Sequence, residues 1–114
     1  MRTRALKFSS VIRGSLQEVL PGLAKSWFDC GCIITDVAMT KDLSIAKVFI
    51  MNHTGDAKEI LAELNQISKI AAHKVSKQNK FRRVPTIRFL ADESYAEAKK
   101  MQHLQELLQQ DTDA

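Results

Sequence analysis

Two runs of β-branched and apolar residues, joined by only four residues, are the feature that most constrains the fold. Residues 33–40 read "IITDVAMT", residues 45–51 read "IAKVFIM", and "KDLS" connects them. Strands joined by so short a connection pair antiparallel. Strand alternation assigns the following residues to the inner face of this hairpin: Ile33, Val37, Met39, Ala46, Val48 and Ile50. Lys47 and Phe49 point the other way.

Helical periodicity flanks the hairpin on both sides. Residues 4–20 carry Phe8, Ile12, Leu16 and Val19 at spacings of four, four and three, which predicts an amphipathic helix. Pro21 cannot donate a backbone hydrogen bond, so this helix is expected to stop or kink by Leu20.

A second helix is predicted after residue 56. Asp56 and Glu59 have the spacing of a capping box, and one apolar stripe follows, formed by Ile60, Leu64, Ile67, Ala71 and Val75. Pro85 marks the limit of this helix, and residues 84–90 predict a third strand with its proline near the start.

Ser94 and Glu97 repeat the capping spacing before a last helix, whose apolar stripe is Tyr95, Ala98, Met101, Leu104 and Leu108. The predicted order is α-β-β-α-β-α. With 114 residues the chain is too short for two cores. We therefore predict one α+β domain over residues 1–110, in which helices cover one face of a three-stranded sheet. Residues 111–114 are expected to be a short disordered acidic tail.

Charge is distributed unevenly along the chain. Residues 1–91 hold 15 basic and 7 acidic side chains, whereas residues 92–114 hold 2 basic and 6 acidic ones. Between Glu63 and Asp92 there is no carboxylate at all. A basic body of this kind indicates a polyanionic partner.

The acid-free stretch places cations on the outer stripe of the second helix and just beyond it. We interpret them as contacts to nucleic-acid phosphates, extended by cations of the first helix and the third strand. The candidate residues are Lys69, His73, Lys74, Lys77, Lys80, Arg82, Arg83, Arg88, Arg4, Lys7 and Arg13. Aromatic residues are few, and Phe81 is the one candidate for base stacking, so shape and backbone recognition of folded RNA is favoured.

Two other interpretations of the basic helix are weaker. A membrane-surface helix would need its apolar face for insertion, and here that face is required by the core. The other interpretation is that the basic face binds no ligand. It would then be solvated and balanced by acids elsewhere, for instance on the last predicted helix.

An enzyme would need a converging set of reactive groups. Cys30 and Cys32 form a single C-x-C, the three histidines show no ligand spacing, and there is no Gly-rich phosphate loop. The expectation is therefore a non-enzyme without metal or cofactor. No leader or membrane-spanning run is recognised, and a cytoplasmic protein is expected.

Two motifs resemble the ribosome-binding factor A family. They are Asp42-Leu43-Ser44 with Ala46-Lys47-Val48, and Arg83-Val84-Pro85 with Ile87-Arg88-Phe89 and Asp92. The likeness covers residues 4–105. It implies a type II KH-like fold and a non-enzymatic factor, monomeric when free, that binds the free small (30S) ribosomal subunit and its 16S rRNA. It further implies a role in late subunit maturation, in processing of the 16S rRNA 5′ end and in growth in the cold.

One departure from this family concerns the second helix. Where the family has Ala-x-Gly, this chain has Ile67, Ser68 and Lys69, and no glycine follows Gly55. A shallow interhelical kink is expected here, supported by Ser68 bonding back to a carbonyl of the preceding turn.

Two non-enzymatic alternatives remain at this stage. The last helix could dock a protein partner through Tyr95, Met101, Leu104 and Leu108. The domain could also be a generic KH-type RNA binder, although it lacks the Gly-x-x-Gly loop that clamps the backbone in such domains.

Overall fold

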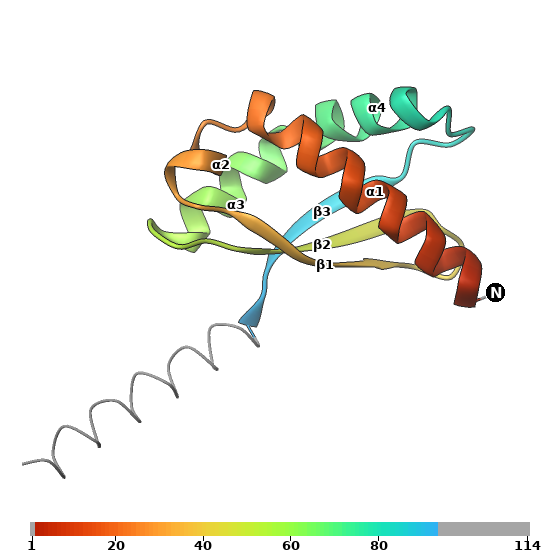
Figure 1. Cartoon of the computed structure of the whole chain (residues 1–114), viewed down its shortest axis with the longest axis horizontal. Coiled ribbons are helices and arrows are strands. Elements are labelled where there is room, and N and C mark those ends of the chain that lie inside the picture. Colours follow the sequence, from red (N-terminus) through yellow and green to blue (C-terminus); the bar gives the residue numbers. More distant parts are fainter. Residues whose placement is uncertain (1, 94–114) are drawn as a thin grey trace, which may run out of the picture.

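In the computed structural model, helices pack on one face of a three-stranded mixed sheet (Figure 1). The structure describes residues 2–93, with side chains from residue 6 onward. The elements are α1 (Arg2–Leu23), α2 (Ser26–Asp29), β1 (Ile33–Met39), β2 (Ile45–Met51), α3 (Ala57–Gln66), α4 (Ser68–Asn79) and β3 (Thr86–Ala91). The expected α+β fold class is confirmed. The helix predicted over residues 94–108 and the acidic tail lie outside the described residues.

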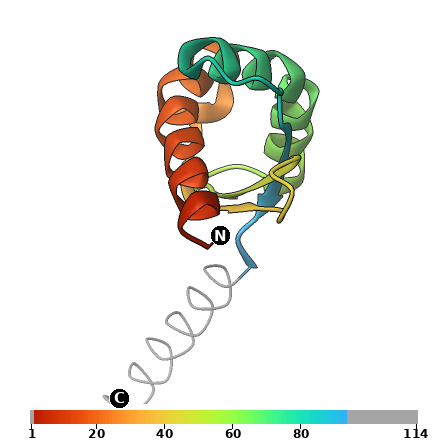
Figure 2. The same ribbon diagram turned by 90° about the vertical axis from the view of Figure 1, so that its right-hand side faces the viewer.

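The sheet has the order β1-β2-β3, so β2 is central. β1 and β2 pair antiparallel, as predicted for the hairpin, and β3 pairs parallel to β2. A parallel neighbour requires a crossover connection, which α3 and α4 supply across the sheet face. Figure 2 shows α1, α3 and α4 arranged over that one face of the sheet.

The core lies between the helices and the sheet. β2 contributes Ala46, Val48 and Ile50, all buried as predicted, and β3 contributes Ile87 and Phe89. The largest fully buried side chains on the helix side are Ile12, Leu16, Leu20, Leu64 and Val75. Burial of this apolar surface is the main force that holds the helices on the sheet.

The prediction that helix 1 stops or kinks by Leu20 is wrong in its position. α1 continues through Pro21 to Leu23, and the Ala24 N–H donates to the Leu20 carbonyl at 2.9 Å. Pro21 removes a single backbone bond in the last turn of the helix. Leu20 and Ala24 are both buried, so their packing holds the last turn in place.

The inner face predicted for β1 is also partly wrong. Ile33 is 50% exposed, and its neighbour Ile34 is buried in its place. The β1–β2 register shifts between Ile34 and Asp36, which inserts one extra residue into β1. Such a bulge reverses the alternation on one side of it. Val37, beyond the bulge, is buried as predicted.

A short helix, α2, was not anticipated from the sequence. Its Trp27 is buried in the core. The backbone N–H and hydroxyl of Ser26, at the start of α2, both donate to the Glu63 carboxylate. Glu63 therefore ties α2 to α3 and satisfies donors at a helix end that has no cap of its own.

Candidate nucleic-acid interface

Helix α4 has one buried and one basic face. Ala71, Ala72, Val75 and Ser76 are buried against the core. The opposite face and the segment that follows it carry seven exposed side chains, which we name the α4 basic surface: Lys69, His73, Lys74, Lys77, Lys80, Arg82 and Arg83. The structure thus brings together the greater part of the cations singled out from the sequence.

These charges are not neutralised within the described part of the chain. None of the seven side chains forms a hydrogen bond or an ion pair with residues 6–93. No carboxylate occurs between Glu63 and Asp92, so none shares α4 with them. The acids after residue 93, which the solvated-face interpretation invokes, lie outside the described residues. The α4 basic surface therefore presents several cations that an anionic ligand could pair with.

The kink defines the first edge of this surface. Ile67 separates α3 from α4, with φ −98° and ψ 8°, and the Ser68 hydroxyl donates to the Asn65 carbonyl at 2.9 Å. The helix is thus interrupted at Ile67 without any glycine, and Ser68 and Lys69 are the first residues of α4. The N-terminus of α4 has no side-chain cap, and Lys69 lies in its first turn. The helix dipole adds positive potential at that end of α4.

Asn65 anchors the kink to the sheet. Its Nδ2 donates to the Phe89 carbonyl at 3.2 Å, and the Phe89 N–H donates to its Oδ1 at 3.0 Å. β3 is an edge strand, so these two bonds satisfy backbone groups that have no strand partner on that side. Periodicity gave no sign of this role, because Asn65 lies off the apolar stripe.

The far edge of the surface is set by the end of α4. Lys80 has left-handed backbone angles, φ 55° and ψ 44°, and the Phe81 N–H donates to the Ser76 carbonyl at 3.0 Å. This is the hydrogen-bond pattern of a Schellman helix end. It turns the chain so that Arg82 and Arg83 follow α4 directly.

Phe81 stacks on Phe8 of α1, with ring centroids 4.5 Å apart. The sequence predicts Phe81 as a candidate for base stacking. In the structure, one face of its ring packs against the ring of Phe8. The same contact brings α1 beside the segment of residues 80–83. Lys7, exposed and adjacent to Phe8, therefore lies near the α4 basic surface.

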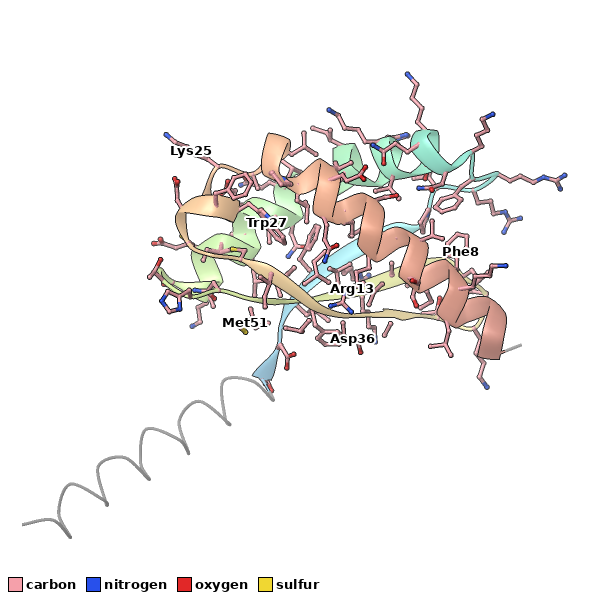
Figure 3. The ribbon with its side chains drawn as sticks, viewed as in Figure 1. Phe8, Arg13, Lys25, Trp27, Asp36 and Met51 are labelled. Carbon is pink, nitrogen blue, oxygen red and sulfur yellow. The ribbon has the colours of Figure 1, made fainter. Side chains whose placement is uncertain are left out.

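Arg13 and Arg4 are the two other candidate cations of α1. The Arg13 guanidinium donates from Nη2 to the Ile34 carbonyl at 3.0 Å, next to the bulge of β1. Its charge is thus tied to the edge of the sheet, and Figure 3 shows it between α1 and β1. Arg4 lies in α1, where the structure describes the backbone alone.

Arg88 is separated from the other candidates. β3 buries Ile87 and Phe89 against the helices, so Arg88 points to the opposite face of the sheet. Arg88 therefore lies on a different face of the molecule from the α4 basic surface, because strand alternation sends successive side chains to opposite faces. Its contact with RNA stays a prediction.

An open groove of about 590 Å³ runs between α1 and the end of α4. Its lining includes Gly14, Ser15, Gln78 and Asn79, and its one charged residue is Glu18. The Asn79 amide bridges the two helices by donating to Ser15 Oγ at 2.7 Å. The groove is therefore not a further phosphate site, since its charge has the wrong sign.

The described residues offer no alternative metal centre or membrane element. Within residues 2–93, no three His, Cys, Asp or Glu side chains gather as a metal site would require. No helix in that range combines the length and apolarity needed to cross a bilayer. Cys30 and Cys32 are free thiols.

Comparison with known proteins supports one family. Residues 4–105 match the family model described as ribosome-binding factor A. A ribosome-binding factor A of Rhodopseudomonas palustris (strain HaA2) is 30% identical over 105 residues, covering 89% of this chain and 78% of the relative. One of Rickettsia africae is 31% identical over 106 residues, covering 89% and 88%.

Solved structures agree on the fold. The crystal structure of ribosome-binding factor A from Thermus thermophilus has a TM-score of 0.67 at 17% identity, covering 76% of this chain and 94% of that one. The solution structure of a putative ribosome-binding factor A from Thermotoga maritima also scores 0.67, at 24% identity, covering 76% and 85%. With the family model spanning nearly the whole chain, the protein belongs to the ribosome-binding factor A family.

Proposed function

We propose that this protein is a non-enzymatic factor that binds the free small (30S) ribosomal subunit through the α4 basic surface. Family membership supports a ribosomal target, since the curated relatives carry the name ribosome-binding factor A. The observation that carries the site is the α4 basic surface itself, six exposed lysines and arginines with His73 among them, none of which pairs with the described part of the chain.

The proposed contact is to the phosphates of 16S rRNA. Cations spread along one helix and the turn after it can contact successive phosphates of a continuous RNA backbone. Each phosphate that they neutralise releases counterions. Phe81 is engaged with Phe8, so base stacking contributes little in this proposal. Lys7 extends the contact from α1. The protein acts as a monomer in the cytoplasm, in late maturation of the subunit and in processing of the 16S rRNA 5′ end.

The kink gives the surface its shape. Because α3 ends at Gln66 and α4 restarts at Ser68, Lys69 and the uncapped N-terminus of α4 lie together at one edge. A phosphate at this edge would receive both the lysine charge and the helix dipole. The lack of the family's glycine is thus compatible with an anion-binding kink in this proposal.

The test is charge reversal on the α4 basic surface. The triple variant Lys74→Glu, Lys77→Glu and Arg83→Glu should fold normally, because all three side chains are exposed, and should no longer co-sediment with purified small subunits. A matched control reverses the same number of charges at Lys25, Lys41 and Lys58, which are exposed outside α4, and should retain binding.

The proposed surface is wrong if the triple variant still sediments with small subunits at moderate salt. Crosslinking the unmodified protein to purified subunits and mapping the modified rRNA positions tests the target separately. Crosslinks confined to ribosomal proteins would argue against rRNA as the partner. Retained binding to unrelated folded RNA, with none to small subunits, would support the generic RNA-binding alternative instead.

A further inference from the structure

The groove between α1 and the end of α4 has one acidic end and one basic end. Val11, Gly14 and Glu18 of α1 line the groove. Lys7 precedes Val11 by four residues, so it lies one turn beyond them on the same face of α1. Lys7 and Glu18 are thus about 16 Å apart along the helix axis, at about 1.5 Å per residue.

The end of α4 adds a second lysine to the basic end of the groove. Lys80, a member of the α4 basic surface, directly follows Asn79 of the groove wall. The stacking of Phe81 on Phe8 brings this end of α4 to the N-terminal part of α1, where Lys7 lies. An RNA chain bound to the α4 basic surface would therefore reach the groove at its basic end.

The interior of the groove offers hydrogen-bond acceptors. Glu18 is exposed and forms no hydrogen bond or ion pair with residues 6–93. Asn79 Nδ2 donates to Ser15 Oγ at 2.7 Å and to the Val75 carbonyl at 2.9 Å, so Oδ1 is left as the acceptor of this amide. A carboxylate and an amide oxygen receive N–H donors. The matching ligand therefore carries N–H donors and is joined to an anion.

Gly14 leaves the middle of the α1 wall without a side chain. Glycine is the least favourable residue in a helix interior after proline. A Cβ at this position would meet no heavy atom within 4 Å, apart from its chain neighbours and its own helix backbone. Packing within the described chain therefore does not require a glycine here. The missing side chain instead gives an outside ligand close access to the backbone of α1.

We infer that the groove binds one or two nucleotides of single-stranded RNA, with a phosphate at Lys7 and Lys80 and the amino group of a base at Glu18. Its volume of about 590 Å³ is in the range of ligand sites. Proteins recognise unpaired bases through hydrogen bonds to the base edges. The inference rests on the proposed function and adds to it a preference for bases that carry an amino group. A basic protein segment would suit Glu18 but would meet the two lysines at the other end.

The test compares the affinity of the full chain for an oligocytidine and an oligouridine of equal length. Their phosphate charges are the same, but cytosine has an amino group where uracil has a carbonyl oxygen. The unmodified chain should bind the oligocytidine about tenfold more tightly, as expected for one hydrogen bond to a charged group. Glu18→Ala should remove this preference. Glu59→Ala, which removes an exposed carboxylate of α3, should keep it.

Gly14→Leu gives a second readout, which a purely structural role of this glycine would not produce. The new side chain should fill the groove and lower the affinity for the oligocytidine about tenfold. The thermal midpoint of unfolding should rise at the same time, because leucine favours a helix. Gly22→Leu is the matched control, since a Cβ there also meets no heavy atom within 4 Å and Gly22 lies in the last turn of α1, outside the groove. It should leave the affinity unchanged.

Equal affinity of the unmodified chain for the two oligonucleotides, or no measurable affinity for either, would overturn the inference. A preference that survives Glu18→Ala would overturn it as well, and so would a Gly14→Leu variant that binds as tightly as the unmodified chain. Loss of small-subunit binding in Glu18→Ala without any oligonucleotide preference would assign the groove to a ribosomal protein and equally overturn it.

The triple charge reversal on the α4 basic surface separates this failure from that of the proposed function. If the triple variant loses small-subunit binding while the oligonucleotides bind equally, the inference alone is wrong. If the triple variant still co-sediments with small subunits, the proposed function is wrong, and the oligonucleotide preference then decides on the groove by itself.

Discussion

The side-chain amide of Asn65 pairs with the backbone of Phe89 as a neighbouring strand would. Nδ2 donates to the Phe89 carbonyl at 3.2 Å and Oδ1 accepts from the Phe89 N–H at 3.0 Å. The backbone carbonyl of Asn65 also accepts a hydrogen bond from the Ser68 hydroxyl at 2.9 Å. Asn65 thus couples the edge of the sheet to the start of α4, and through it to the orientation of the α4 basic surface.

Replacing Asn65 by Ala should lower the free energy of unfolding by about 2 kcal/mol, since each of two hydrogen bonds contributes about 1 kcal/mol net. Urea denaturation monitored by Trp27 fluorescence measures the loss. Gln66→Ala is the control, because Gln66 is the next residue and its side chain is exposed. It should change the free energy of unfolding by less than about 0.5 kcal/mol. Equal effects of the two substitutions would refute the bridging role of Asn65.

Lys80→Gly should raise the free energy of unfolding by about 1 kcal/mol, because a side chain in the left-handed region costs about 1–2 kcal/mol that glycine avoids. Lys77→Gly removes the same charge from the helical part of α4 and should lower stability by about 1 kcal/mol. Thermal and urea denaturation compare the two variants. A loss of stability in Lys80→Gly would contradict the left-handed helix end.

Lys77→Ala should weaken binding to small subunits and reduce the dependence of log affinity on log salt by about 0.7–0.9, the contribution of one phosphate contact. Affinity measured over a series of salt concentrations provides the slope. Lys58→Ala, on the exposed face of α3, should leave the slope unchanged. A slope that responds equally to both substitutions would show that net charge, and not the α4 basic surface, determines binding.

Asp42 organises the β1–β2 turn, where its carboxylate accepts from the Thr40 hydroxyl at 2.7 Å and from the Ser44 hydroxyl at 2.7 Å and N–H at 3.1 Å. These hydrogen bonds lower the pKa of Asp42 from 3.8 to about 2, and the bond from the Ser44 hydroxyl has the largest effect. A lowered folded-state pKa means that the carboxylate stabilises the protein above pH 3.8. That contribution is lost as the pH falls from 3.8 toward 2.

Carboxyl carbon resonances recorded against pH should therefore show Asp42 titrating near pH 2. In Asp42→Asn, the pH dependence of stability should flatten over the same interval, because the titrating group is gone. Titration of Asp42 close to pH 3.8 in the folded protein would mean that the turn hydrogen bonds do not persist in solution.

The two cysteines should differ in reactivity. Burial, followed by the neighbouring Cys30 and Glu63, raises the pKa of the Cys32 thiol from 9.0 to about 11. At pH 8 its thiolate fraction is then about one in a thousand, and the thiolate is the reactive form. Brief alkylation followed by mass spectrometry should modify Cys30, which is half-buried, before Cys32. In urea both should react; similar rates without urea would contradict the burial of Cys32.

Local pattern was sufficient wherever neighbours in sequence decide the outcome. The hairpin of β1 and β2, the buried face of β2 and the Asp56 cap on α3, which accepts from the Lys58 N–H at 3.0 Å, all follow from short-range spacing. The exposed cations of α4 follow as well, since the apolar stripe that seats the helix leaves the opposite stripe to solvent.

Contacts between distant residues decided the rest. Packing of Leu20 and Ala24 carries α1 past Pro21, and the bulge in β1 exchanges Ile33 for Ile34 in the core. β3 pairs parallel to β2, and Arg13 binds a strand carbonyl 21 residues away. Periodicity describes each segment alone, so it cannot identify which element lies opposite.

The sequence by itself thus determined the class of fold and the sign of its outer helix, because side-chain spacing and charge are properties of the chain. Only the tertiary structure decided which cations share a surface and how α4 is held at its kink. The physical reason is that Asn65 and Phe89, like Phe8 and Phe81, meet only when strands and helices far apart in the chain pack together.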